Sequence, residues 1–221
     1  MKRIKAVLFD LDGTLADTAP DLAQTLNTLL QENDKTPLSY ESIRPYVSHG
    51  AIALLKLGFP EVEEDRLLDY FRDRFLRIYQ DNLTQHTRLF EGMPELLEQL
   101  ETSDITWGVV TNKPAFLTDP LMEQLNLHTR AKTIISGDTT ANKKPHPEPI
   151  YLACSQAKVE PEQAIYVGDA ERDIRAGNAA GLITLAALFG YLSKDDKPEQ
   201  WHATGIIKHP LEIAQWVFKK P

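Results

Sequence analysis

The feature that most constrains the fold is a short apolar run that ends abruptly in two carboxylates, Asp10 and Asp12. The run, Ala6 to Phe9, is typical of a buried strand in a parallel sheet. Ligands of open α/β sheets bind beyond the carboxyl ends of the strands, so both aspartates stand where chemistry is expected. Alternation would send their side chains to one side, and Gly13 permits a turn or a close backbone approach. Because two carboxylates this close repel, a metal-assisted nucleophile with an acid or base beside it is favoured over a simple helix cap.

Strand and helix patterns alternate over most of the chain. The predicted strands are residues 6–9, 105–110, 133–135, 164–167, 183–187 and a short one near Ile206. Helical patterns separate them, which predicts an α/β fold with a doubly wound, Rossmann-like parallel sheet. Between residues 18 and 88 the segments are amphipathic and helical, without a strand pattern. This stretch is therefore predicted to be an all-helical insertion.

Three predicted strands end in polar residues that can meet at one edge of the sheet. The two aspartates follow the first strand, Thr111 follows 105–110, and Asp169 follows 164–167, while Lys144 lies on a polar, proline-rich loop. Each has a simpler explanation when taken alone. Thr111 can cap the next helix, Lys144 can be solvated, and Asp169 with Asp173 can favour a helix start. Their agreement in strand-end position favours one shared site.

This set resembles the four motifs of the haloacid dehalogenase-like hydrolases. The matches are Asp10-Leu11-Asp12-Gly13-Thr14 for the first motif, Thr111 for the second, Lys144 for the third, and Asp169 with Asp173 for the fourth. Lys143 stands next to Lys144, but the family's lysine directly precedes a proline, here Pro145.

The resemblance covers essentially the whole chain and implies two domains. The catalytic core is expected at residues 1–17 and 89–221, and a helical C1-type cap at residues 18–88. Hinges are expected near Asp17 and Thr18 and between Thr87 and Phe90.

The resemblance also implies a phosphatase reaction on a small-molecule phosphomonoester. Asp10 would be the nucleophile that forms an aspartyl-phosphate, and Asp12 the general acid and base. Thr111 and the Asn112 backbone would donate hydrogen bonds to the phosphoryl oxygens, and Lys144 would offset charge.

Mg2+ is the cofactor that the resemblance implies. Its ligands would be the Asp10 and Asp169 carboxylates and the Asp12 backbone carbonyl. Asp173 would contact the ion through water or steady the other ligands.

The cap is expected to choose the substrate, because a lid over the sheet edge excludes water and brings further residues to the phosphate. The predicted contact is the loop Ser48-His49-Gly50, between short helices expected at Tyr40 to Val47 and Ala51 to Leu57, with Arg44 one turn earlier. A helix cap or a surface position would explain His49 as well as a substrate contact does.

Longer segments indicate a branch of the family. The chain as a whole resembles the phosphoglycolate phosphatase branch. Some segments resemble the N-acetylmuramic acid 6-phosphate phosphatases of bacterial cell-wall recycling: Leu89 to Met93, Trp107 to Pro114, Lys144 to Pro149, and the tail from Gly190 through Trp201 to Glu212. The resemblance favours N-acetylmuramic acid 6-phosphate as substrate, with 2-phosphoglycolate as the alternative.

The presence of Asp12 distinguishes between several other possible functions. Dehalogenases and phosphonatases have no acid at this place. A mutase of the beta-phosphoglucomutase kind shares the whole site and stays open. A phospho-acceptor signalling domain also uses a strand-end aspartate and Mg2+, but it needs neither Asp12 nor the inserted cap. The sequence has no Walker-type phosphate loop.

Composition limits the partners. The net charge of -8 disfavours a nucleic-acid-binding surface and requires local positive charge for an anionic substrate. Cys154 is the only cysteine, which fits a reducing compartment. No apolar stretch approaches the roughly 18 residues of a membrane span, and the first apolar run is too short for a signal-peptide core. We therefore expect a cytoplasmic monomer or weak homodimer without a nucleic-acid or membrane partner.

Overall fold

The computed structural model describes residues 3–218, apart from the side chains of residues 67 and 68. Six parallel strands form its main sheet in the order β5-β4-β1-β6-β7-β8. The strands are β1 (Ala6–Phe9), β4 (Thr106–Val110), β5 (Thr133–Ile135), β6 (Ala164–Gly168), β7 (Ile183–Ala187) and β8 (Gly205–Ile207). This arrangement confirms the predicted α/β class with a parallel sheet and a helical insertion.

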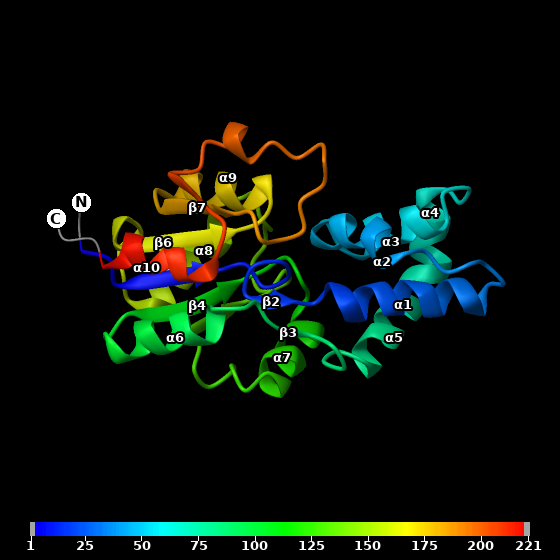
Figure 1. The fold of residues 1–221 in the computed structure, drawn as a ribbon, viewed down its shortest axis with the longest axis horizontal. Helices are drawn as coiled ribbons and strands as arrows, with labels where there is room; N and C mark the ends of the chain where they lie inside the picture. The colour runs from blue at the N-terminus through cyan, green and yellow to red at the C-terminus, as the bar shows by residue number, and fades with distance from the viewer. Residues whose placement is uncertain (1–2, 219–221) are drawn as a thin grey trace.

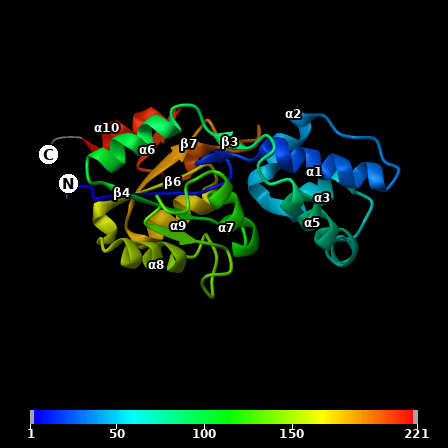
Figure 2. The same cartoon turned by 90° about the horizontal axis from the view of Figure 1, so that it is seen from below.

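Helices cover both faces of the sheet. Figure 2 shows α6 (Met93–Thr102) and α10 (Ile213–Val217) on one face, and α8 (Glu148–Ala157) and α9 (Glu171–Ala180) on the other. Strand β1 lies between them, and its side chains alternate: Val7 and Phe9 join one apolar cluster, Ala6 and Leu8 another. Burial on both faces explains why this strand is apolar throughout. The sheet domain also contains α7 (Ala115–Gln124) and short 3-10 helices η3 (Pro161–Gln163), η4 (Pro198–Gln200) and η5 (Pro210–Glu212).

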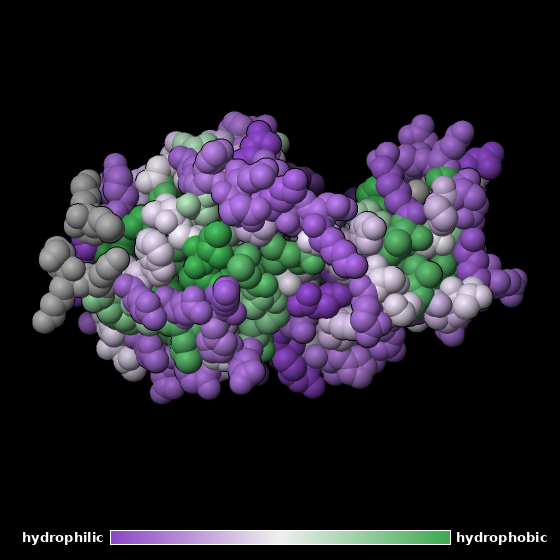
Figure 3. Space-filling model, turned by 45° about the horizontal axis from the view of Figure 1, so that its top comes forward, coloured by the Kyte–Doolittle hydropathy of each residue, from purple (hydrophilic) through white to green (hydrophobic). Residues whose placement is uncertain are grey.

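Residues 19–81 form a separate helical lobe, which we call the cap. Its elements are α1 (Ala19–Glu32), α2 (Tyr40–Ile43), the 3-10 helix η1 (Arg44–His49), α3 (Gly50–Gly58), α4 (Glu64–Arg66), the π-helical turn η2 (Leu67–Arg72) and α5 (Asp73–Asp81). Figure 1 shows the cap beyond the sheet edge at which β1 ends, and Figure 3 shows a notch between the two lobes. The boundaries expected at residues 17/18 and 88/89 stay a prediction.

Two chain crossings connect the lobes, and they lie side by side. β2 (Ala16–Asp17) pairs antiparallel with β3 (Arg88–Leu89). The Asp21 carboxylate at the start of α1 accepts hydrogen bonds from the backbone N–H groups of His86 and Thr87 and from the Thr87 hydroxyl. Strands of two residues are too short for a sequence pattern to reveal. The hinge function expected at these crossings stays a prediction.

The junction at residues 48–50 differs from the expected loop. Ser48 and His49 end the 3-10 helix η1, and Gly50 begins α3 directly. Gly50 has a φ of 81°, a left-handed backbone that glycine adopts without strain. The chain therefore turns sharply between two helices without a separate loop. Within residues 3–218, no helix is long and apolar enough to cross a membrane.

Candidate active site

The first predicted motif lies at the carboxyl end of the central strand. Asp10 follows β1 directly, is buried, and accepts a hydrogen bond from Leu11 N at 2.7 Å. Asp12 Oδ1 accepts hydrogen bonds from Thr18 Oγ1 at 2.6 Å and from Lys113 Nζ at 2.8 Å. A Cβ on Gly13 would lie 2.2 Å from Asp169 Oδ2, so only glycine lets the two strand ends approach this closely.

Lys144 is a fully buried cation at the centre of the site. Its Nζ lies 2.9 Å from Asp10 Oδ1 and 2.7 Å from Asp173 Oδ1, and it donates to Val110 O and Tyr166 Oη at 2.8 Å each. Its neighbour Lys143 is exposed. The geometry therefore puts Lys144, the lysine preferred from the sequence, against the carboxylates.

The segment of the second motif, Thr111 with Asn112, holds the backbone of Lys144 in place. Thr111 follows β4 and is buried, and its Oγ1 accepts a hydrogen bond from Lys113 N at 3.1 Å. The Asn112 side chain accepts from Lys144 N at 3.1 Å and donates to Lys144 O at 3.0 Å. These two bonds tie the loop between β5 and α8 to the end of β4, and so place the ammonium group.

Three buried carboxylates form a group that can hold a metal ion. Oxygens of Asp10, Asp169 and Asp173 lie within 4.8 Å of one another. Asp169 Oδ2 accepts hydrogen bonds from Ser48 Oγ at 2.6 Å and Tyr191 N at 2.8 Å, whereas its buried Oδ1 has no hydrogen-bond partner among the described residues. An unpartnered buried carboxylate oxygen within an acidic cluster fits a hard divalent cation.

The electrostatics of the three carboxylates differ. Burial, together with the charges of Asp10 and Asp173, raises the pKa of Asp169 to about 7 from an ordinary value of 3.8. Burial and Asp10 likewise raise the pKa of Asp173, although Lys144 opposes them. Burial also acts to raise the pKa of Asp10, but Lys144 and Arg172 outweigh it and hold that pKa below its ordinary value.

These shifts predict a pH-dependent stability for the metal-free protein. Between about pH 4 and about pH 7 the folded chain holds a proton on Asp169 that the unfolded chain has lost. The free energy of unfolding should therefore fall as pH rises through this window, and Asp173 acts in the same direction. The lowered pKa of Asp10 acts only below this window.

A divalent cation at these carboxylates displaces the proton, so its affinity should rise with pH up to about 7. Melting temperatures in EDTA and in Mg2+ across this pH range measure both effects. A pH-independent stability in EDTA, or a metal affinity that ignores pH, would contradict the prediction.

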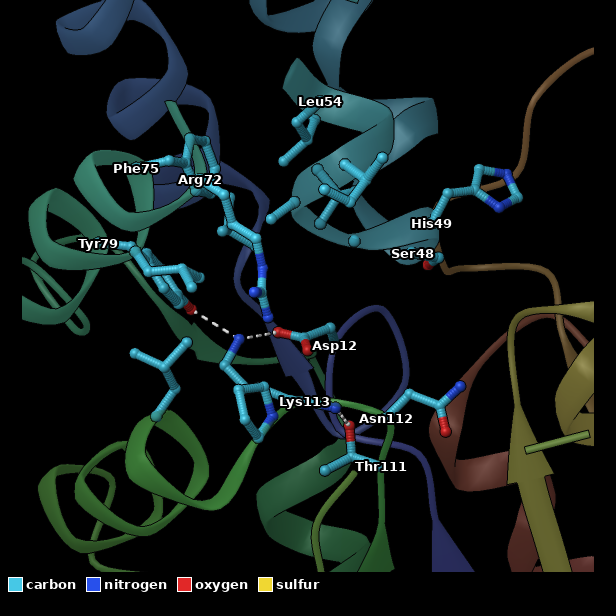
Figure 4. Close-up of a pocket in the computed structure, with 18 of the residues that line it drawn as sticks. Asp12, Ser48, His49, Leu54, Arg72, Phe75, Tyr79, Thr111, Asn112 and Lys113 are labelled. Atoms are coloured by element: carbon cyan, nitrogen blue, oxygen red, sulfur yellow. Dashed lines mark hydrogen bonds and ion pairs between the residues drawn. The ribbon is translucent and has the colours of Figure 1, made fainter. Parts of the chain in front are cut away.

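A cavity of about 420 Å³ opens between this site and the cap. Figure 4 shows Asp12, Thr111, Asn112 and Lys113 on its core side. The cap contributes Ser48, His49, Gly50, Arg72 and the apolar or aromatic side chains of Leu54, Phe75 and Tyr79. The predicted contacts Ser48, His49 and Gly50 thus line the cavity, and their contact with the substrate stays a prediction. His49 lies on the open side of the cavity. Desolvation of its imidazole and the nearby charge of Arg172 lower its pKa.

Arg44 is placed elsewhere. Its Nη2 donates to Phe189 O at 3.2 Å, its guanidinium lies 5.0 Å from the centre of the Tyr191 ring, and it does not line the cavity. The arginine therefore joins cap and core in this structure, and its expected contact with the substrate stays a prediction.

Sequence reasoning gave no role to several cations of the site. Lys113 Nζ lies 4.5 Å from the centre of the Tyr79 ring and donates to its hydroxyl at 3.0 Å. Burial opposes the charge of Lys113, but Asp12 and Tyr79 raise its pKa above the ordinary value. Arg172 lies 3.8 Å from Asp10 Oδ2. Lys113 and Arg172 each adjoin a motif residue, which is the signal that could have revealed them.

Comparison with known proteins agrees with the fold and the site. The model of the haloacid dehalogenase-like hydrolase family matches residues 7–187. An N-acetylmuramic acid 6-phosphate phosphatase from Pseudomonas putida is 41% identical over 213 residues, which is 96% of each chain. A phosphoglycolate phosphatase from Xanthomonas campestris is 39% identical over 98% of this chain and 99% of its own.

A crystal structure described as a predicted phosphoglycolate phosphatase from Haemophilus somnus superposes with a TM-score of 0.86 at 28% identity. It covers 98% of this chain and 99% of its own. The chain belongs to the haloacid dehalogenase-like hydrolases, as its four motifs suggested.

Proposed function

We propose that this phosphomonoester hydrolase acts on N-acetylmuramic acid 6-phosphate and that Mg2+ supports the reaction. The observation that carries the choice of substrate is the cavity of about 420 Å³ above Asp10 and Asp12. A phosphate group fills only the end of such a cavity. The remaining space and its apolar wall fit a leaving group as large as a substituted sugar.

The cavity wall matches such a leaving group. Phe75 and Tyr79 come from α5, and Leu54 comes from α3. Aromatic and aliphatic side chains pack against the carbon skeleton and acetyl methyl of an amino sugar. The 41% identity to a phosphatase named for this substrate supports the same choice.

2-Phosphoglycolate is the second candidate. The observation in its favour is the relative from Xanthomonas campestris, which is 39% identical and named as a phosphoglycolate phosphatase. Its two-carbon leaving group would leave the apolar wall of the cavity without contacts.

The residues of the site suit a double-displacement reaction. The Leu11 N–H and Lys144 hold Asp10 Oδ1, which fixes the carboxylate for attack on phosphorus. The attack forms an aspartyl-phosphate and breaks the bond to the leaving oxygen, which takes a proton from Asp12. Asp12 then removes a proton from water, the water oxygen attacks phosphorus, and the Asp10 carboxylate is regenerated.

The surrounding groups hold the reactants. Thr18 and Lys113 both bind Asp12 through Oδ1, so within the described residues its Oδ2 is available for proton exchange. Thr111 and Asn112 line the cavity, and the Thr111 side chain and the Asn112 backbone would donate hydrogen bonds to the phosphoryl oxygens. Mg2+ held by Asp10, Asp169 and the Asp12 carbonyl, with Asp173 beside them, would offset the negative charge of the phosphoryl group.

The test is phosphate release from a panel of phosphomonoesters in Mg2+, compared by kcat/KM. The panel contains N-acetylmuramic acid 6-phosphate, 2-phosphoglycolate, hexose phosphates and nucleotides. We expect the muramic acid ester to exceed the others by at least about 100-fold, because the cavity contacts the whole leaving group. A preference for 2-phosphoglycolate would overturn the substrate assignment. Isomerisation of a hexose 1-phosphate without net phosphate release would replace hydrolysis by a mutase reaction.

A further inference from the structure

The cavity carries more positive charge than the phosphoryl site uses. Four cationic side chains line it, Arg72, Lys113, Lys143 and Arg172, against the two carboxylates Asp10 and Asp12. Lys113 is paired with Asp12 at 2.8 Å, and Arg172 lies 3.8 Å from Asp10. Arg72 and Lys143 have no ion-pair partner within the described part of the chain. Because the protein has a net charge of -8, two uncompensated cations at one cavity require an explanation.

Arg72 reaches the cavity from an irregular part of the cap. It is the last residue of the π-helical turn Leu67–Arg72, which continues into α5. π-helical turns are rare and frequently lie at functional sites. Helix α5 supplies Phe75 and Tyr79 to the same wall, and Figure 4 shows the Arg72 side chain directed downward toward Asp12. Arg72 thus stands on the leaving-group side of the site.

We propose that Arg72 binds a carboxylate of the substrate, so that the enzyme selects phosphomonoesters whose leaving group carries a second negative charge. The inference deepens the proposed function and rests on it. Lys144 and Arg172 already lie beside the nucleophile, where the phosphoryl group must bind. A planar guanidinium pairs with a carboxylate through two parallel hydrogen bonds, which gives geometric selectivity as well as charge.

The chemistry of both candidate substrates agrees with a carboxylate-binding role for Arg72. N-acetylmuramic acid 6-phosphate and 2-phosphoglycolate differ in size, but each joins a phosphomonoester to a carboxylic acid. The substrates for which these two relatives are named thus share a carboxylate, and the phosphoryl site alone does not bind it. A cation on the cap side of Asp12 can bind this carboxylate.

Lys143 is the competing cation, and the structure favours Arg72 over it. Lys143 lies on the core loop beside Lys144, on the opposite side of the cavity from the cap helices. Arg72 shares its side of the cavity with the apolar residues that would contact the leaving group. A carboxylate on that leaving group therefore meets Arg72.

The experiment compares substrate pairs in which one member lacks the group that carries the carboxylate. The pairs are N-acetylmuramic acid 6-phosphate with N-acetylglucosamine 6-phosphate, and 2-phosphoglycolate with ethyl phosphate. Wild type, Arg72→Met, Lys143→Met and Arg77→Met are assayed in Mg2+, and Arg77 serves as the control because it is an exposed arginine on α5 outside the cavity. Because Arg72 is exposed on the cap surface, its variant should keep the wild-type melting temperature.

We expect Arg72→Met to lower kcat/KM for the carboxylated substrate by about 10- to 100-fold, mostly through KM, while the neutral partner changes little. An equal loss on both members of a pair would overturn the proposal, because it would place Arg72 at the phosphate. A selective loss in Lys143→Met or Arg77→Met, with Arg72→Met unaffected, would overturn it as well.

The wild-type values separate this proposal from the proposed function. If wild type prefers 2-phosphoglycolate, the assignment to the muramic acid ester fails, and the glycolate pair still decides the role of Arg72. If wild type hydrolyses the neutral member of each pair as well as the acid, the carboxylate is not read and the role of Arg72 is refuted.

Discussion

Replacing Asp10 with asparagine is expected to lower kcat on the best phosphomonoester on the order of 10⁴-fold or more, because the amide oxygen is a far weaker nucleophile than the carboxylate. Leu11 N at 2.7 Å and Lys144 Nζ at 2.9 Å hold the Asp10 carboxylate in place, as the proposed attack on phosphorus requires. Asparagine has the same shape and can still accept the hydrogen bond from Leu11. Phosphate release at saturating substrate measures the loss.

The comparison that isolates the chemistry uses a second aspartate. Asp119 is exposed on α7, away from the cavity, and Asp119→Asn should keep the wild-type kcat. Circular dichroism and a melting curve show whether Asp10→Asn is folded. A folded Asp10→Asn enzyme that keeps more than about a tenth of the wild-type kcat would refute the nucleophile role.

The core of the site could be predicted because the topology leaves little choice. β4, β1 and β6 are neighbours in a parallel sheet, so Thr111, Asp10 and Asp169 must emerge at the same edge. Buried strands read as continuous apolar runs, and the polar residue that ends each run is visible in the sequence. The position of Lys144 needed the Lys-Pro pattern of the family, because a lysine on a loop carries no signal of burial.

The contacts between cap and core could not be predicted in the same way. The sequence places Tyr79 on the apolar face of a helix, but its hydroxyl binds Lys113, which pairs with Asp12. Ser48 reaches Asp169 across 121 residues of sequence. Such pairs depend on how the cap lies against the sheet, and no local period or propensity encodes that placement.

The irregular parts of the cap could not be predicted from the sequence either. A helical pattern across residues 63–82 gives no sign of the π-helical turn that ends at Arg72, because the apolar residues on either side of the turn still recur every three or four positions. At residues 48–50 a glycine suggested a loop, but the structure uses the glycine to turn one helix directly into the next.

Lys144→Met is expected to destabilise the metal-free protein by about 3–5 kcal/mol, because it removes one partner of a buried ion pair. The ammonium group contacts Asp10 and Asp173 and donates to Val110 O and Tyr166 Oη. Without it, three carboxylates within 4.8 Å of one another would repel, with Arg172 as their remaining nearby cation. Urea unfolding in EDTA measures this loss, and kcat should fall with it because Asp10 loses the cation that holds it.

The metal dependence of the same variant distinguishes a charge role for Lys144 from a packing role. With Lys144 gone the carboxylate group is more negative, so a divalent cation should bind it more tightly. Mg2+ should therefore raise the melting temperature of Lys144→Met by more than it raises that of wild type. Lys143→Met is the matched control, because its exposed side chain lies one residue away and makes no ion pair within the described residues, so it should behave as wild type in EDTA and in Mg2+. If Lys144→Met loses stability but gains no more from Mg2+ than wild type does, the lysine fills space in the core and does not balance the charge of the aspartates.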